Sequence, residues 1–250
     1  MQVSKFLNFL CWLIHAPYKA EKWLYLTGII DYGKDMKIQA ALKRLNTQLP
    51  LKARQDKLSP ALKVVHQKVL SSLIMQGRPP DEDDLKVILG GADMQTSLHR
   101  LGADDLIVLD AAGKHLLGAY PVTLEDTPHK LSVNGHLIHA MCALDAVAVA
   151  PLFATEVLIE STCYLSRTPI IIHMRGDSIL EVQPTAAVTV AVRWQMPSAV
   201  AAHSMCMEMV FFRDRAGAEA WQGGDMEKTS LFTLPEAVAF GKAFFLPLLD

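Results

Sequence analysis

Strand-like and helix-like runs follow one another without a regular period in the second half of the chain, and this pattern constrains the fold most. From residue 129 onward, polar breaks separate β-branched or aromatic runs: HKLSVNG, EVLIEST, TPIIIHM, AAVTVAVRW and MEMVFF. The helix-like run CALDAVAVAP, closed by Pro151, lies between the first two, and GAEAWQ and LPEAVAFGKAFFLPLL end the chain. Because a doubly wound sheet needs regular alternation, the sequence predicts an α+β fold with a mixed, mainly antiparallel β core over residues 129–250.

The first part of the chain is predicted to be a helical extension over residues 1–77. Its sequence looks helical but is weakly patterned up to residue 57. Ser59 and Pro60 then provide an N-cap and a proline at the first helical position. Gly77 ends the apolar periodicity that follows, which predicts a helix between these two signals.

Phe6–Ala16 is the segment that bears on targeting and membrane contact. It is a mostly apolar run of 11 residues, FLNFLCWLIHA, behind one lysine. A membrane-spanning helix needs about 20 apolar residues, and the A-x-A pattern of a cleavable signal is missing. We therefore interpret the run as a helix that docks on the core, and we expect a cytoplasmic protein without membrane contact.

Residues 78–128 have the outline of a winged helix. Two short helices, PPDEDDLKVILGG and ADMQTSLHRLG, are followed by a hairpin whose strands flank Ala112 and Gly113. The second helix carries only His99 and Arg100 as basic groups, and the chain has 24 Lys and Arg against 26 Asp and Glu. Nucleic-acid binding normally takes a basic excess. We expect a packing or lid role for this unit, and no nucleic-acid partner.

The four cysteines, Cys11, Cys142, Cys163 and Cys206, are too few and too scattered for a disulfide framework. None lies in a C-x-x-C pair, which disfavours a structural zinc site. The chain also lacks a P-loop, a dinucleotide fingerprint and the common hydrolase motifs. The sequence therefore predicts free thiols in a reducing compartment.

Cys142 is the thiol with the strongest local signal for chemistry. It stands at the start of a predicted helix, where the helix N-terminus favours the thiolate. Asp145 follows at i+3 and is expected on the same helix face. An acid beside a thiolate is unfavourable unless it carries a proton or a cation lies between the two. A plain helix with a buried cysteine and a capping aspartate would show the same pattern, so the spacing alone leaves both interpretations open.

Residues 126–212 resemble the organomercurial (alkylmercury) lyase family. The matching stretches are DTPHKLSVNG, HAMCALDA, STCYLSRTPI and SMCMEMVFF, and AGAEAW and PEAVAFGKAF match the C-terminal pattern of the family. The resemblance implies a catalytic set of Cys142, Asp145 and Cys206, with Cys163 as a structural thiol. The chain departs from the family at Met141, where Trp is common, and at Met207, where a second cysteine often follows the first.

The family resemblance implies protonolysis of a carbon–mercury bond, giving a hydrocarbon and mercury(II). Mercury(II) is a soft ion that prefers thiolate ligands, so Cys142 and Cys206, with Asp145 nearby, would hold it transiently as product. No organic cofactor is expected. The implied partners are the organomercurial substrate, low-molecular-weight thiols and a mercuric reductase that receives mercury(II).

The alternative is a non-catalytic soft-metal-binding protein, or a metal-responsive regulator that uses the winged-helix unit. Asp145 favours the enzyme, because a pure metal binder needs the thiols but no proton donor. The helix–helix–hairpin outline favours the regulator, although its basic charge is low. Four histidines are expected to lie outside the site, either at the surface or hydrogen-bonded in the core: His136, His139, His173 and His203.

Overall fold

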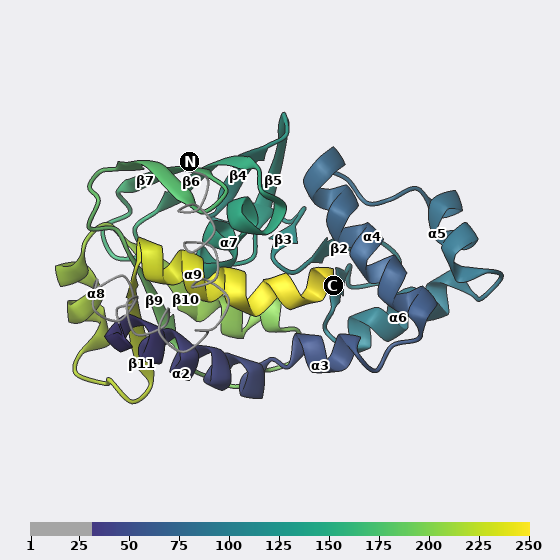
Figure 1. Ribbon diagram of the computed structural model, residues 1–250, viewed down its shortest axis with the longest axis horizontal. Helices are drawn as coiled ribbons and strands as arrows, with labels where there is room; N and C mark the ends of the chain where they lie inside the picture. Colours follow the sequence, from purple (N-terminus) through teal and green to yellow (C-terminus); the bar gives the residue numbers. More distant parts are fainter. Residues whose placement is uncertain (1–31) are drawn as a thin grey trace, which may run out of the picture. The chain divides into compact units, whose positions relative to one another are not determined.

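A computed structural model describes residues 32–250 of the chain, and the helices and strands named below belong to this part (Figure 1). Contacts between Cα atoms group the chain into two compact units, residues 1–40 and 41–250. The predicted helix at Phe6–Ala16, with Cys11 in it, lies outside the described residues. The predicted division into residues 1–77, 78–128 and 129–250 stays a prediction.

The helices before the sheet begin and end largely where the sequence signals place them. They are α2 (Tyr32–Gln48), α3 (Leu51–Gln55), α4 (Pro60–Gln76), α5 (Glu82–Leu89) and α6 (Met94–Ala103). At the start of α4 the Leu62 N–H donates to Ser59 Oγ at 3.3 Å, and Gly77 ends the helix with φ +65°. The predicted N-cap and stop signal of this helix are therefore confirmed.

The core contains two antiparallel sheets. The larger has the strand order β1-β2-β3-β5-β4-β6-β7-β8, and the smaller has β10-β9-β11. Every strand pair in both is antiparallel, which confirms the predicted α+β class. The strands are β1 (Ile107–Leu109), β2 (Leu116–Ala119), β3 (Val122–Thr123), β4 (Lys130–Val133), β5 (His136–Ala140), β6 (Glu156–Thr162), β7 (Pro169–Arg175), β8 (Ser178–Gln183), β9 (Thr189–Arg193), β10 (Met209–Phe212) and β11 (Thr229–Thr233).

The hairpin predicted around Ala112 and Gly113 is formed by β1 and β2. It continues into the larger sheet, because β2 pairs with β3 and β3 pairs with β5. The order helix, helix, hairpin is therefore present, but its strands are the edge of the main sheet. The winged-helix character of this unit stays a prediction.

Two helices of the second half pack closely against each other, α7 (Ala143–Phe153) and α9 (Leu234–Phe245), as Figure 1 shows in teal and yellow. Every residue from Ala143 to Leu152 is buried, so the alanine-rich run makes a helix that is covered on all sides. At Gly241 in α9, an added Cβ would lie 3.0 Å from the Ala148 side chain and 3.1 Å from the Leu144 carbonyl oxygen. Glycine at this position therefore permits the close approach of the two helices.

One predicted boundary is wrong. The helix at CALDAVAVAP does not close at Pro151 but runs on to Phe153 and ends at Ala154, which has φ +48°. Pro151 lies near the last turn, where it removes one helical hydrogen bond without ending the helix. The Thr155 N–H then donates to the Ala150 carbonyl at 3.2 Å and completes the end.

The strands β3, β5, β8 and β11 lie outside the sequence prediction. β8 is an edge strand with mostly exposed residues, so it lacks the buried alternation that identifies a strand in sequence. β5 has histidine at its first and fourth positions, and β11 is a short mixed run, TSLFT. Their strand character comes from pairing with neighbours.

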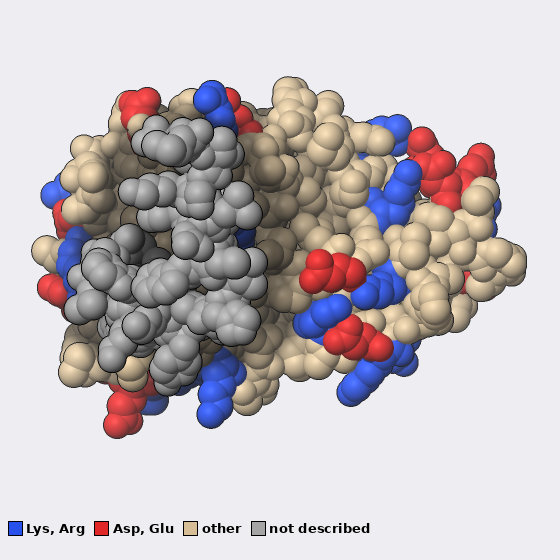
Figure 2. Space-filling view, viewed as in Figure 1, with Lys and Arg blue, Asp and Glu red and all other residues tan. Residues whose placement is uncertain are grey.

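Charged residues around α5 are mixed in sign. Figure 2 shows Lys and Arg next to Asp and Glu over this part of the surface. The ion pairs there are Lys68–Asp84 at 2.9 Å, Arg78–Asp81 at 2.7 Å and Lys86–Asp83 at 3.2 Å. The absence of nucleic-acid binding stays a prediction. Within residues 32–250, no helix combines the length and the apolar character needed to cross a membrane.

Candidate active site

Two thiols and a carboxyl group from distant parts of the chain meet in the core. Cys142 is the N-cap of α7, Asp145 lies in its first turn, and Cys206 lies in the short 3-10 helix η2 (Met205–Glu208) just before β10. One ligand atom of each lies within 4.8 Å of the other two, and all three residues are buried. The fold therefore brings together thiols that are 64 residues apart in sequence.

The local geometry of Cys142 follows from its place at the helix start. Its backbone is extended, and its Sγ accepts a hydrogen bond from the Asp145 N–H at 3.4 Å. This is the hydrogen bond that an N-cap side chain makes to the third residue of a helix. The i+3 spacing thus places thiol and carboxyl on one face of α7, as predicted.

The ionisation of Cys142 differs from the sequence prediction. A helix N-terminus alone would favour the thiolate, but burial raises the pKa of this thiol well above its ordinary value. The hydrogen bond with Cys206 and the charge of Asp145 act in the same direction. Cys142 is therefore a thiol at neutral pH until a ligand replaces its proton.

Cys206 and Asp145 are also held in their protonated forms. The hydrogen bond with Cys142 lowers the pKa of Cys206, but burial and the carboxylates of Asp145 and Asp105 outweigh it, so the net shift is upward. Burial raises the pKa of Asp145 from 3.8 to about 8, against the effect of its hydrogen bonds with Cys142. The two thiols and the carboxyl group are therefore protonated at pH 7.

The second carboxyl oxygen of Asp145 has no partner. Among the described residues, Oδ2 is buried and makes no hydrogen bond. Buried polar atoms are nearly always paired, so an unpaired one marks a place where a proton, water or ligand belongs. Here the unpaired atom belongs to a carboxyl group that is clustered with two thiols.

A cavity of about 350 Å³ leads to the cluster. Cys206 lines it, whereas Cys142 and Asp145 do not, so an incoming molecule meets Cys206 first. Two other lining groups are His129 and His203. Burial lowers the pKa of His129 to about 4, so its ring is neutral at pH 7. The cavity is large enough for a small organic group beside the thiol.

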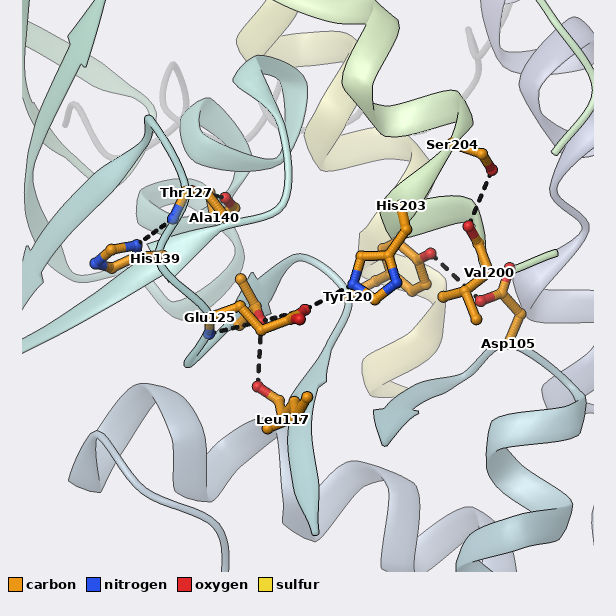
Figure 3. Close-up of polar contacts among 11 residues, drawn as sticks. Asp105, Leu117, Tyr120, Glu125, Thr127, His139, Ala140, Val200, His203 and Ser204 are labelled. Carbon is orange, nitrogen blue, oxygen red and sulfur yellow. Dashed lines mark hydrogen bonds and ion pairs between the residues drawn. The ribbon is translucent and has the colours of Figure 1, made fainter. Parts of the chain in front are cut away.

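His203 is closer to the site than the sequence predicts. Its Nε2 lies 2.8 Å from Glu125 Oε2, and Figure 3 shows the two side chains pointing toward each other. Both residues line the cavity. His139 accepts a hydrogen bond from the Thr127 N–H at 2.7 Å. His136 and His173 do not line the cavity, as expected. Only tertiary structure distinguishes His203 from the other three histidines.

Tyr120 and Asp105 support the segment that carries Cys206, and neither was predicted from sequence. Tyr120 O–H donates to Asp105 Oδ1 at 3.4 Å (Figure 3). The Ala201 N–H donates to Asp105 Oδ2 at 3.2 Å. Asp105 adopts φ +57°, a conformation that costs a non-glycine residue free energy. The Tyr120 side chain also acts to lower the pKa of Cys206. The two hydrogen bonds of Asp105 tie Tyr120 to the backbone five residues before Cys206.

Cys163 lies apart from the cluster. It follows β6 by one residue, is buried, and its N–H donates to the Thr168 carbonyl at 2.8 Å. Burial raises the pKa of this thiol, but hydrogen bonds from the Ser166 side chain and from neighbouring backbone groups outweigh it, so the pKa falls below its ordinary value. The group of thiols and carboxyl that could share one metal ion does not include it.

Cys163→Ser is expected to lower stability and to leave turnover largely intact. A buried hydroxyl costs about 1–3 kcal/mol if it is unpaired, and the hydrogen bonds from the Ser166 region place the cost at the lower end. Urea unfolding monitored by far-UV circular dichroism measures the change in unfolding free energy. A folded Cys163→Ser protein without activity would contradict the structural role.

Comparison with known proteins links this site to one family. The family model for alkylmercury lyase matches residues 122–246, half of the chain. An alkylmercury lyase from Bacillus cereus is 35% identical over 100 residues, which are 40% of this chain and 45% of that protein. One from Staphylococcus epidermidis is 26% identical over 176 residues, covering 69% and 78% respectively.

The fold has a counterpart among solved structures. The crystal structure of the mercury-bound form of MerB2 superposes with a TM-score of 0.66 at 21% identity, covering 80% of this chain and 98% of that one. The chain therefore shares its fold with that protein, and its sequence matches the family over the half that contains the three clustered residues.

Proposed function

Since the chain belongs to the alkylmercury lyase family, we propose that it cleaves carbon–mercury bonds by protonolysis, releasing a hydrocarbon and mercury(II). The observation that carries this proposal is the buried group of Cys142, Asp145 and Cys206, with an unpaired carboxyl oxygen in it. Two soft sulfur ligands suit mercury(II), and a protonated carboxyl group next to them suits proton delivery to carbon.

The reaction balances with the groups present. A substrate R–Hg–SR′ first exchanges its thiol for Cys206, which lines the cavity; the Cys206 proton leaves with R′SH. Cys142 then bonds to mercury as the carbon–mercury bond breaks, and the bonding pair stays with carbon. The Cys142 proton reaches that carbon through Asp145, giving R–H. Mercury remains in the +2 state, held by the two sulfurs.

No oxidant, reductant or organic cofactor enters this balance, and we propose that none is required. Two thiols of low molecular weight would remove mercury(II) by exchange and return the protons to Cys142 and Cys206. A mercuric reductase is the proposed recipient of the ion, and the cytoplasm, where such thiols are abundant, is the proposed location.

A non-catalytic soft-metal binder is the second candidate function, and the buried carboxyl group disfavours it. A metal binder gains nothing from a carboxyl group whose burial raises its pKa to about 8. Burying such a group costs free energy, and groups with strongly shifted pKa values cluster at catalytic sites.

The test is incubation of the protein with methylmercury or phenylmercury and excess thiol, with methane or benzene measured by headspace gas chromatography. In deuterium oxide the product is expected to be monodeuterated, because the transferred proton comes from exchangeable groups. Mercury bound without release of hydrocarbon would support the metal binder instead.

Turnover is expected to fall as the pH rises through about 8. The pKa of Asp145 is raised to about 8, so the carboxyl group carries its proton below this pH and loses it above. The rate at saturating substrate is measured from about pH 6 to about pH 9.5, with the external thiolate concentration held constant. Asp145→Ala should lack this alkaline decline. A wild-type rate that keeps rising through pH 8 would contradict proton delivery by Asp145.

A further inference from the structure

A third sulfur lies beside the thiol of Cys142. Cys142 Sγ–H donates to the thioether Sδ of Met209 at 3.7 Å, and both atoms are buried. Met209 is the first residue of β10, where pairing with Val192 on β9 holds its backbone. The position of the Met209 side chain is therefore set by a strand of the core.

Met209 also lies where the space around the thiols narrows. It lines the cavity of about 350 Å³ together with Cys206. It lines as well a small gap of about 10 Å³ that Tyr120, Asp145 and Cys206 share. Met209 and Cys206 are thus common to the walls of both spaces.

The hydrogen bond indicates where a metal would sit. A metal ion that binds Cys142 replaces the thiol proton, and Met209 Sδ lies 3.7 Å from the Cys142 Sγ that would bind the ion. The ion would then occupy space between the two sulfurs. Thioethers are soft ligands that suit soft metal ions. A thiol must lose its proton to bind a metal well, whereas a thioether has none to lose.

We propose that Met209 is a third sulfur ligand of the mercury in this site, contacting the ion together with Cys142 and Cys206. This inference rests on the proposed function, since it concerns the same ion. Met209 adds a neutral ligand, so it holds an organomercury cation or mercury(II) near the thiols without adding charge. Its weak binding leaves the ion free to exchange to external thiols.

Selenium labelling tests the proposal directly. Protein is prepared with selenomethionine and loaded with one equivalent of mercury(II), and the mercury environment is measured by X-ray absorption. The expected result is two short sulfur neighbours from the cysteines and one longer selenium neighbour. Met209→Leu is expected to abolish the selenium signal and keep both sulfurs, because leucine has a similar volume but no soft atom.

Met207→Leu is the matched control. Met207 lies two residues away and lines the same cavity, but its side chain is 59% exposed. The selenium neighbour should persist in this variant. Loss of selenium in Met207→Leu, or its persistence in Met209→Leu, would overturn the assignment.

The outcomes separate the inference from the proposed function. Two sulfur neighbours without selenium in the labelled wild type would refute the role of Met209 and leave the cysteine pair intact. Mercury without the two cysteine sulfurs would contradict the proposed function itself. The rate of mercury release to excess thiol, expected to be faster in Met209→Leu than in Met207→Leu, gives an independent readout.

Discussion

Cys142→Ser and Cys206→Ser are each expected to abolish turnover, leaving no more hydrocarbon than thiol alone produces. A hydroxyl group is a hard, poor ligand for a soft ion, so mercury would lose one of its two anionic ligands. The Cys142→Ser variant should remain folded, because Ser is a favoured N-cap residue. Its hydroxyl oxygen can accept the hydrogen bond from the Asp145 N–H.

The measurement is headspace detection of methane under single-turnover conditions, with circular dichroism to confirm that each variant is folded. Cys163→Ser serves as the control, since it changes a buried thiol outside the group. Full activity in Cys206→Ser would contradict the proposal that Cys142 and Cys206 bind mercury together, even if the fold is right.

Asp145→Ala is expected to bind mercury still but to slow hydrocarbon release by on the order of 10²–10⁴-fold, the range for loss of a general acid. Both thiols remain in this variant, so the ion keeps its sulfur ligands. Asp145→Asn is the matched variant, because it preserves the shape of the side chain without an exchangeable acid proton.

Binding and turnover are measured on the same samples, by the ultraviolet absorption of mercury–thiolate bonds and by gas chromatography. Loss of mercury binding in both variants would make Asp145 a structural residue. An unimpaired rate in either would exclude it as the proton donor.

Local signals in the sequence predicted the helix that carries two of the three site residues. The Ser59 cap and Gly77 stop of α4, and the Cys142–Asp145 spacing at the start of α7, depend on hydrogen bonds within a few residues. Such interactions leave a pattern in the sequence. The antiparallel core likewise follows from runs of β-branched residues that appear in order along the chain.

Tertiary structure determines the remaining features. Cys206 reaches Cys142 across 64 residues, and only the resemblance to a known family predicted this pairing. The helix N-terminus predicted a lowered pKa for Cys142, but burial of the thiol raises its pKa instead. Burial of a single cysteine depends on tertiary packing and leaves no local pattern. Met209 and Tyr120 carry no local signal, because a buried methionine or tyrosine in sequence is indistinguishable from ordinary core.

The close packing of α7 and α9 has a consequence for the order of events during synthesis. Cys142 begins one helix, and the helix that packs against it at Gly241 is made about 90 residues later. A ribosome-bound chain that has reached only Cys206 already holds both thiols but lacks this partner helix. We therefore expect the newly made thiols to remain accessible to metals and oxidants until residues 234–245 emerge and dock, which makes protection of the site a late step of folding.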